Sequence, residues 1–587
     1  MPLFIKSIKK FNRKNILPLC VCTILIPSML TGCGISPESN KFDRYLDNLF
    51  KSEVCSNTLN LHYTLSSPSN YGISDYKVTF GDLSKDARSK NTDSLRQAKK
   101  DLKRFHRFLL SDEQKLNYDL LSDYIDSQLA MCDFELYDDM LSPSNGLQSQ
   151  LPVLFAEYKF RSETDVVDYL QLLKQLDSYY TDIVAFEREK SDAGLFMNDS
   201  LCLDVIKECE AFIKNPEKNY LLSTFETKIN EMDEISASDK DKYIKENQEI
   251  IEEHVIPAYQ ILIQGLTLLL GTGENDDGVC VYDSGKGYYA SLVKMSTGSD
   301  DSIENLDQRI KEKREADLAV CTEIKEKIPD IAEKSSNIDW KYEDEEDMIA
   351  VLQKSLLKEF PKMPDTSYEI SDVDKSLSDS LAPAFYITAP IDNYDENTIY
   401  INSASEYPDI YYFTTLAHEG YPGHLYQTVM SYHYGMAPFR SLLDYGGFTE
   451  GWATYVEMLS YYYAGLDEDV ASFLQHSEAA TLSLYASSDI GIHYHGWNRR
   501  QLYDFWKEYG FTDEDMIDRV RELILADPGN YLKYYVGYLE FEELREVKEE
   551  KYGKKFDPVK FHEAILKIGP APFDIIDMYF DDYYKQS

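Results

Sequence analysis

Apolar residues recur every three or four positions over much of residues 43–327, which is the pattern of amphipathic helices. One such run begins at Asp93, and its apolar positions are Leu95, Ala98, Leu102, Phe105 and Leu109. Ser111 and Ser162 are each followed three residues later by a side chain that can complete a capping box. The sequence therefore predicts that two further helices begin there, the second of them running to about Lys190.

Other helices are expected from Asn198 to about residue 215, over residues 239–270 and over residues 302–327. Pro257 is expected to interrupt the second of these, because proline has no backbone N–H to donate. Residues 271–287 are expected to be loop. The sequence contains no internal repeat and no series of alternating strands. Residues 43–367 are therefore predicted to form a helical scaffold half.

The pattern changes near Tyr368. Residues 381–390 and 398–402 have the composition of strands and are bounded by Pro, Asp and Asn, which predicts one small β-element in a mostly α fold. Helices are expected again over residues 411–424, 425–436, 446–464 and 473–508. Residues 368–587 are predicted to be the second half, and both halves to belong to one domain of about 43–587.

The composition is that of a globular protein with a strongly acidic surface. Hydrophobic residues make up 43% of the chain and the formal net charge is −43 at pH 7. This charge argues against nucleic-acid binding, which requires basic patches. We interpret it as a solvated exterior that favours solubility. The sequence gives no indication of the oligomeric state.

The first 32 residues have the layout of a secretory signal, with lysines and an arginine followed by the apolar run 16–30. The run ends in Leu30-Thr31-Gly32-Cys33, which resembles a bacterial lipobox and implies lipidation of Cys33. The alternatives are a plain signal peptide or a single membrane anchor, for which the run is short. Residues 33–42 are expected to be a tether, and the protein to be lipid-anchored at the extracytoplasmic face of a bacterial cell membrane.

Candidate metal chemistry lies at residues 418–424, where the sequence reads H-E-G-Y-P-G-H. Imidazole is a preferred zinc ligand, and a carboxylate beside it can act as a base on water. His424 is six positions after His418, about 240° around a regular helix and therefore on the wrong face for joint ligation. Because Pro422-Gly423 breaks or bulges a helix, two looped-out residues are expected to return His424 to the required face.

A third ligand is expected from the helix that follows. The segment between His424 and Glu450 is long enough for the rest of one helix, a turn and the start of a returning helix. Glu457 shares a helix face with Glu450 and is expected to hold a ligating histidine in its tautomer. The sequence thus predicts one zinc ion held by His418, His424 and Glu450.

These residues resemble a known family. H-E-x-x-P-G-H followed by E-G-W-A at 450–453 is similar to the bacterial family catalogued as domain of unknown function 885, which is related to helical zinc peptidases of the angiotensin-converting-enzyme and thimet-oligopeptidase type. Three further blocks match in order: D-I-G-I-H-Y-H-G-W at 489–497, P-G-N-Y-L-K-Y-Y-V-G at 528–537 and F-H-E-A-I-L at 561–566. Leu425 and Asn530 depart from the family pattern, and neither is a proposed ligand.

The resemblance implies a large helical zinc-peptidase-like fold with a deep cleft. It implies that residues 398–402, with Tyr400, pair with an extended substrate, although a small structural hairpin is the alternative. Tyr534 is implied to stabilise the oxyanion, Lys533 to be a cleft cation and Tyr531 to bind substrate. His493 is implied to donate to the oxyanion, and a core histidine is the alternative.

The function predicted from these residues is a membrane-anchored zinc peptidase acting on short peptides. Glu419 would take a proton from water, and the resulting hydroxide would attack a carbonyl polarised by zinc. One alternative is a non-catalytic binding lipoprotein of the same fold. Another is a zinc amidase or esterase that acts on a non-peptide substrate.

Overall fold

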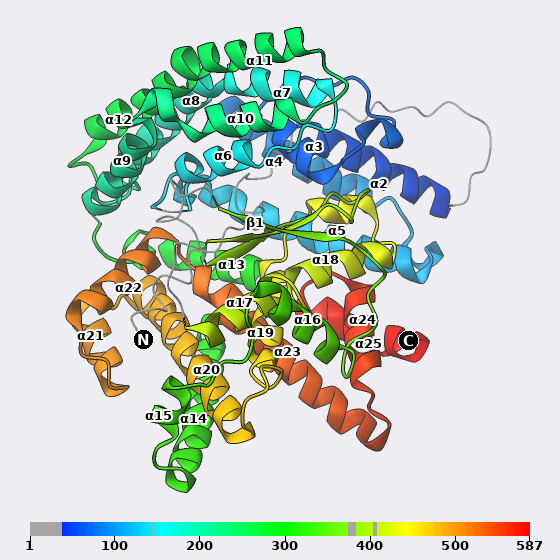
Figure 1. The fold of residues 1–587 in the computed structure, drawn as a ribbon, viewed down its shortest axis with the longest axis vertical. Coiled ribbons are helices and arrows are strands. Elements are labelled where there is room, and N and C mark those ends of the chain that lie inside the picture. The colour runs from blue at the N-terminus through cyan, green and yellow to red at the C-terminus, as the bar shows by residue number, and fades with distance from the viewer. Residues whose placement is uncertain (1–37, 144, 274, 374–382, 403–407) are drawn as a thin grey trace.

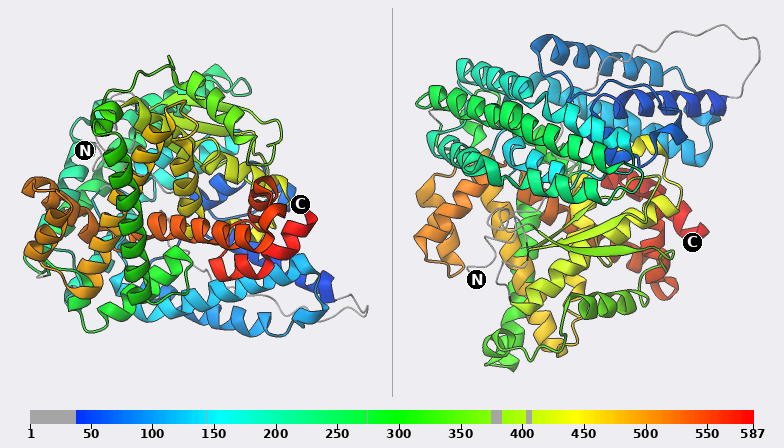
Figure 2. Two further views of the ribbon diagram at one scale, coloured as in Figure 1. Left: turned by 90° about the horizontal axis from the view of Figure 1, so that it is seen from below. Right: turned by 45° about the horizontal axis from the view of Figure 1, so that its top comes forward.

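The computed structural model describes residues 38–143, 145–273, 275–373, 383–402 and 408–587. Within these residues the chain is mostly α-helical with one three-stranded sheet, which confirms the predicted fold class. Figure 1 shows two layers of helices with the sheet between them, and the turned view of Figure 2 shows the same arrangement. None of the helices in these ranges has the length and apolar character needed to cross a lipid bilayer.

The first layer is built from the helices that precede residue 270. They are α2 (Glu38–Val54), α3 (Thr58–Thr64), α4 (Lys85–Leu102), α5 (Asp112–Met131), α6 (Leu147–Ala156), α7 (Glu163–Leu173), α8 (Leu176–Asp192), α9 (Asp199–Ile213), α10 (Tyr220–Asn230), α11 (Ala237–Ile250) and α12 (Ile256–Leu269). The capping boxes predicted at Ser111 and Ser162 are both present. A π-turn over Ile251–Val255 interrupts the long helix just before Pro257, as predicted.

The second layer contains the remaining helices. They are α13 (Gly285–Thr297), α14 (Ile303–Lys327), α15 (Ile331–Ser336), α16 (Glu345–Leu356), α17 (Asp409–Glu419), α18 (His424–His433), α19 (Gly446–Ser460), α20 (Glu468–Ile490), α21 (Arg499–Glu508), α22 (Glu514–Ala526), α23 (Asn530–Tyr552), α24 (Pro558–Ile568) and α25 (Phe573–Gln586). The sequence pattern did not predict α13, whose first residues fall in the expected loop.

The predicted tether is wrong for residues 38–42, which form the first turn of α2. The Glu38 carboxylate accepts a hydrogen bond from the backbone N–H of His106 at 3.0 Å, and Phe42 is fully buried. Packing of this turn against the protein makes it part of the fold. The predicted signal segment 1–32, Cys33 and the remainder of the tether lie outside the described residues.

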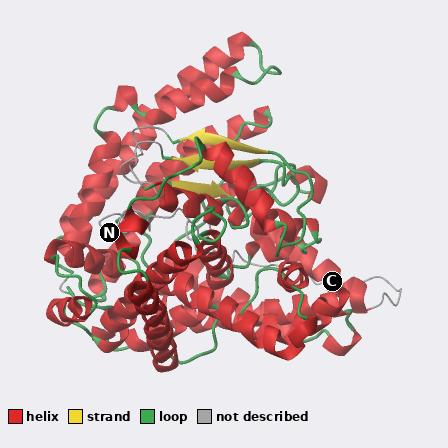
Figure 3. Ribbon diagram, turned by 60° about the horizontal axis from the view of Figure 1, so that its bottom comes forward, coloured by secondary structure: helices red, strands yellow, loops and turns green. Residues whose placement is uncertain are grey.

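The sheet contains β1 (Tyr368–Asp372), β2 (Ala384–Ile387) and β3 (Asn397–Ile401) in the order β1-β3-β2. β3 is the central strand: it pairs parallel with β1 and antiparallel with β2. The three strands lie side by side among the helices in Figure 3. The prediction that residues 398–402 pair with substrate is therefore wrong, because both edges of β3 are already hydrogen-bonded to neighbouring strands.

The apolar cores do not follow the predicted division at residues 367 and 368. One core unites residues 42–125 and 289–360 with residues 386–584, so α2 and α5 share it with α17, α19 and α23. A second core lies within residues 59–269 and takes in only Phe385, Ile387 and Tyr400 from the sheet. A third, smaller core lies within residues 484–531. The two predicted halves are therefore not separate folding units.

Helices α19 and α23 approach each other closely because glycines meet where they cross. A Cβ atom on Gly451 would lie 2.4 Å from Cα of Gly537, and one on Gly537 would lie 2.1 Å from the carbonyl oxygen of Gly447. Backbone atoms cannot yield at such distances, so only glycine permits the contact. The crossing brings the helix that carries Glu450 against the helix that carries Tyr534.

We predict that Gly451→Ala destabilises the protein by about 1–3 kcal/mol, because the added methyl group must push the two backbones apart. Urea unfolding measures this change. Gly287→Ala is the matched control: its methyl group would meet Phe134 at an ordinary 3.6 Å inside α13. The control should lose no stability, and equal losses in both variants would contradict the role given to the crossing.

Candidate metal centre

The two histidines of the H-E-G-Y-P-G-H run lie on either side of a break between two helices. His418 is in the last turn of α17, which ends at Glu419, and His424 is the first residue of α18. The peptide bond between Tyr421 and Pro422 is cis. The helix stops completely here, which confirms the predicted break, although residues 420–423 lie outside the helices rather than the expected two. The expected result is nevertheless present, because the imidazole ring centroids are 4.8 Å apart.

Gly423 and Trp452 define the shape of this turn. The backbone N–H of Gly423 donates to the carbonyl of Ala417 at 2.9 Å, and a Cβ atom on Gly423 would lie only 1.8 Å from the carbonyl oxygen of His418. The indole N–H of Trp452 donates to the carbonyl of Pro422 at 2.8 Å. Trp452 is fully buried on α19, so the turn is fixed to the helix that also carries Glu450.

Glu450 lies between the two histidines. Its Oε2 atom is 3.6 Å from Nε2 of His418 and 3.4 Å from Nε2 of His424. Potential ligand atoms of His418, Glu419 and His424 also lie within 4.8 Å of one another. The three predicted ligands, from α17, α18 and α19, are therefore brought together, with the predicted base beside them.

The surroundings fit a divalent cation. His418 is fully buried and Glu450 is 3% exposed, and Oε2 of Glu450 has no hydrogen-bond partner among the described residues. A buried carboxylate oxygen without a partner is costly unless a cation compensates for it. Two imidazoles and one carboxylate are a donor set that zinc commonly uses, and three protein ligands are typical of a catalytic rather than a structural site.

Glu457 holds His418 as predicted. Its Oε2 atom lies 2.8 Å from Nδ1 of His418, and the two glutamates of α19 are separated by two turns of that helix. Because a carboxylate accepts, Nδ1 of His418 is the protonated nitrogen, and the lone pair is on Nε2, which is the atom near Glu450.

Charges around Glu450 keep it ionised. Burial acts to raise its pKa, but the charges of His424 and Lys533 and the polar contacts with both histidines lower it well below the usual 4.5. The carboxylate is therefore present as an anion, which is the form that ligates a metal.

Glu419 is positioned by the sheet. The backbone N–H of Tyr386 in β2 donates to Oε2 of Glu419 at 3.2 Å, and the carboxyl group is 3% exposed. This donor was not predicted, because nothing in the sequence relates a strand to a side chain 33 positions later. The pairing of β2 with β3 on its other side fixes the donor in space.

Tyr534 and Lys533 also lie beside the centre. The Tyr534 ring is 6.3 Å from the His418 ring. Burial, the charges of Glu450 and Glu419 and a hydrogen bond to Glu450 raise the pKa of Tyr534 well above 10, so its hydroxyl keeps its proton. The Nζ atom of Lys533 is 5.4 Å from the Tyr534 ring centroid. The structure thus places both residues beside the candidate ligands, and the oxyanion and cleft roles that the resemblance implied for them stay predictions.

Tyr400 and Tyr531 do not lie there, and their assignment to substrate binding is wrong. The Tyr400 ring stacks on Phe385 at 4.8 Å, and its hydroxyl bonds to Glu157 of the first layer. Tyr531 is 2% exposed and packs on Tyr485 at 4.9 Å in the third core. Both are core residues, because neighbouring side chains on a strand or helix point in different directions.

His493 is also a core residue rather than an oxyanion donor. The backbone N–H of Val279 donates to its Nδ1 at 3.2 Å, and its Nε2 is 2.9 Å from the carbonyl of Ile524. The imidazole is 1% exposed, and burial lowers its pKa to about 4. With both nitrogens bonded to backbone, the side chain has no donor left for substrate.

Asp489, in the same block, is structural as well. Its carboxylate accepts hydrogen bonds from the backbone N–H of Gly529 at 3.0 Å and from the Tyr289 hydroxyl at 2.6 Å. Gly529 caps the start of α23. The hydrogen bond between Asp489 and Gly529 therefore fixes the start of α23, the helix that carries Lys533 and Tyr534.

The deep cleft implied by the resemblance stays a prediction. His418, Glu419 and Glu450 are each at most 3% exposed. Residues 374–382 and 403–407, which adjoin the sheet and α17 in the sequence, lie outside the described residues.

Fold and site together define a mostly α-helical protein with a buried candidate metal centre at a helix break. The chain matches the model of the family described as "Bacterial protein of unknown function (DUF885)" over residues 67–578. It therefore belongs to this family, which confirms the resemblance seen in the motifs. The relation to helical zinc peptidases stays a prediction.

Solved structures share the fold. A "putative lipoprotein" from Colwellia psychrerythraea superimposes with a TM-score of 0.83 at 19% identity, covering 94% of this chain and 100% of that chain. A "putative lipoprotein of unknown function" from Shewanella oneidensis gives a TM-score of 0.64 at 15% identity, covering 91% and 99%. No curated protein was found to match. At these identities the likeness shows the fold alone.

We predict that His493→Gln leaves metal content unchanged and reduces the acid sensitivity of folding. Neutral His493 contributes stability above pH 6.5, and this is lost as the pH falls toward about 4, because only the unfolded state can then be protonated freely. The loss is at most about 3 kcal/mol. Urea unfolding of wild type and variant between pH 7 and pH 4 measures it. A stability gap that widens on acidification, or a variant that loses metal, would contradict the structural role.

Proposed function

We propose that this protein is a zinc-dependent hydrolase whose substrates are peptides. The observation that carries the proposal is the position of Glu450 Oε2, 3.6 Å and 3.4 Å from the Nε2 atoms of His418 and His424. His418, His424 and Glu450 would hold the ion. When bound, zinc would supply a Lewis acid that polarises a carbonyl group and acidifies water.

Glu419 is the proposed general base. Its carboxylate lies beside the proposed ligands, and the Tyr386 N–H fixes one oxygen, which leaves the other to accept a proton from the attacking water. The same carboxylate can then return the proton to the leaving amine. Its near-complete burial favours this role, because exclusion of bulk water strengthens the interaction between the carboxylate and the attacking water.

Tyr534 is the proposed oxyanion donor. Its hydroxyl keeps its proton and lies on the side of the centre formed by α23. An oxygen that gains negative charge in the transition state accepts a stronger hydrogen bond than the carbonyl it came from. Lys533, whose charge already acts on Glu450, adds positive potential at the same place.

An extended peptide is the substrate class that the sheet supports best. β2 is an edge strand, and the N–H of Tyr386 points away from β3 toward Glu419. A peptide added along the outer edge of β2 would use main-chain groups of that strand other than the Tyr386 N–H, which Glu419 occupies, and would place a backbone carbonyl near the base. This assigns to β2 the pairing that the resemblance had implied for residues 398–402.

We also propose that the protein is a lipoprotein anchored through Cys33 at the extracytoplasmic face of the cell membrane. The lipobox-like Leu-Thr-Gly-Cys segment supports this proposal. So does the description of two proteins of the same fold as "putative lipoprotein".

We predict that the protein binds about one zinc per chain, that His424→Ala loses it, and that Glu419→Gln keeps it while abolishing hydrolysis. The histidine is a proposed ligand, whereas the glutamate is a proposed base whose amide replacement is nearly the same size. Metal analysis by mass spectrometry and digestion of a peptide library measure the two properties separately. If His424→Ala retains full zinc occupancy, the ligand set is wrong. Zinc-loaded wild type that cleaves an ester or a non-peptide amide but no peptide would instead favour the amidase or esterase alternative.

We predict that Tyr534→Phe lowers kcat by about 10²–10³-fold with little change in KM or zinc content, because one oxyanion donor is removed. Tyr535→Phe is the matched control. Tyr535 is fully buried against Tyr538, and burial and the charge of Asp317 raise its pKa well above 10. Steady-state kinetics of the Tyr534→Phe and Tyr535→Phe variants, with zinc content measured in the same samples, test this difference. A wild-type rate for Tyr534→Phe would remove the phenol from the mechanism.

A further inference from the structure

The turn between α4 and α5 is basic and apolar in an otherwise acidic protein. Residues 102–110 read L-K-R-F-H-R-F-L-L and contain no carboxylate, whereas the whole chain has 103 acidic and 60 basic residues. Phe108 is 76% exposed, more than any other large hydrophobic side chain in the described residues, and its neighbour Leu109 is 54% exposed. Adjacent exposed apolar side chains beside basic ones are a combination that suits contact with a membrane interface.

This turn is held to the protein by side-chain hydrogen bonds and burial, although its tip is exposed. The guanidinium of Arg107 donates to both oxygens of Asp119 at 2.7 Å and 2.6 Å and to the Tyr579 hydroxyl at 2.9 Å. Leu110 is 4% exposed, so the chain is anchored on both sides of Phe108 and Leu109. The hydrogen bonds of Arg107 and the burial of Leu110 thus hold Phe108 and Leu109 at the exposed tip of the turn.

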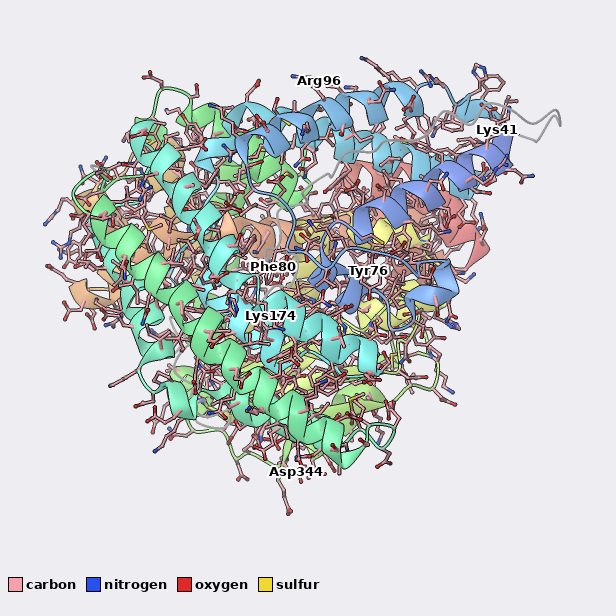
Figure 4. The ribbon with its side chains drawn as sticks, turned by 90° about the horizontal axis from the view of Figure 1, so that it is seen from above. Lys41, Tyr76, Phe80, Arg96, Lys174 and Asp344 are labelled. Atoms are coloured by element: carbon pink, nitrogen blue, oxygen red, sulfur yellow. The ribbon has the colours of Figure 1, made fainter. Side chains whose placement is uncertain are left out.

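The turn packs directly on the first residues of α2. His106 donates its backbone N–H to Glu38, and the Phe105 ring contacts Phe42 edge-on at 5.2 Å. Gln114 at the start of α5 donates to the backbone carbonyl of Ser39 at 3.2 Å. Figure 4 shows Lys41 at one end of the molecule, which places this contact there too.

Cys33 precedes Glu38 by five positions in the sequence. A chain of that length spans at most about 18 Å even when fully extended. If Cys33 carries lipid, the bilayer surface must therefore lie within roughly this distance of Glu38, whose carboxylate contacts the turn. A lipid on Cys33 would therefore keep the end of the protein that carries Glu38 close to the membrane.

We propose that the α4–α5 turn is a membrane-docking element: Phe108 and Leu109 enter the interface, and Lys103 and Arg104 contact anionic headgroups. The proposal rests on the lipid anchor proposed for Cys33. Arg104 is 2.8 Å from Asp101 but its side chain is 75% exposed, so its charge stays accessible to a headgroup. Asp112, which follows the turn, is itself paired with Lys115. Anchor and turn together would fix the orientation of the protein and keep the acidic remainder away from an anionic surface.

The test places a fluorophore at the turn. Phe108→Trp and Leu268→Trp are made in the full chain, and each is measured in vesicles of brominated phosphatidylcholine and phosphatidylglycerol against wild type, which corrects for the four native tryptophans. Leu268 is the matched control, because it is 74% exposed near the end of α12, across the first layer from α2 (Figure 1). Bromine quenches only tryptophans that reach the acyl region. We expect loss of fluorescence for Phe108→Trp and none for Leu268→Trp.

Incorporation of labelled palmitate into wild type, but not into Cys33→Ala, tests the anchor separately. Lipidated protein in which Phe108→Trp is quenched no more than Leu268→Trp would overturn the docking proposal and leave the anchor standing. If wild type takes up no palmitate, the lipoprotein proposal fails. The docking proposal is then tested with the unlipidated chain from Gly34 onward, mixed with the same vesicles. Quenching of Phe108→Trp there, weakened by Lys103→Gln with Arg104→Gln, would support docking, and its absence would overturn it.

Discussion

The contact between α19 and α23 is the constraint on which the centre depends. Gly451 and Gly537 bring two helix backbones closer than any side chain would allow. Three consecutive residues of α19 then act in three directions: Glu450 lies between the histidines, Gly451 touches α23, and Trp452 holds the turn before His424. Because one helix makes all three contacts, a change in its position would affect the ligands, the turn and Tyr534 together.

The sheet adds a second constraint from the opposite side. β2 presents the Tyr386 N–H to Glu419, and β3 beside it presents Tyr400 to Glu157 in the first layer. Lys228 donates to the carbonyls at the end of α6, on both sides of Glu157, and its own pKa is lowered to about 7 by burial. The position of the base is thus tied through β2 and β3 to the helices of the first half, which carry no candidate catalytic residue in their own sequence.

Several blocks that look chemical in the sequence are there for support. His493 has both nitrogens on backbone groups, and His562 contacts the Glu359 carbonyl at 2.7 Å and the Tyr455 hydroxyl at 3.1 Å. Asp489 fixes the start of α23. Histidine and aspartate are conspicuous in a motif whether they bind a substrate or satisfy a buried backbone, and residue type alone does not separate the two uses.

The sequence by itself determined what depends on local order along the chain. Helical periodicity gave the mostly α fold, the serine caps gave two helix starts, and the spacing of His418, Pro422 and His424 required a break between the histidines. The spacing of Glu450 and Glu457 gave a shared helix face. The tertiary structure decided what depends on distant segments. It made β3 central, turned Tyr400 and Tyr531 into the core and gave Glu419 its donor in β2. The physical reason is that the direction of a side chain follows from local backbone geometry, whereas its partners follow from how separate elements pack, and no spacing along the chain encodes that.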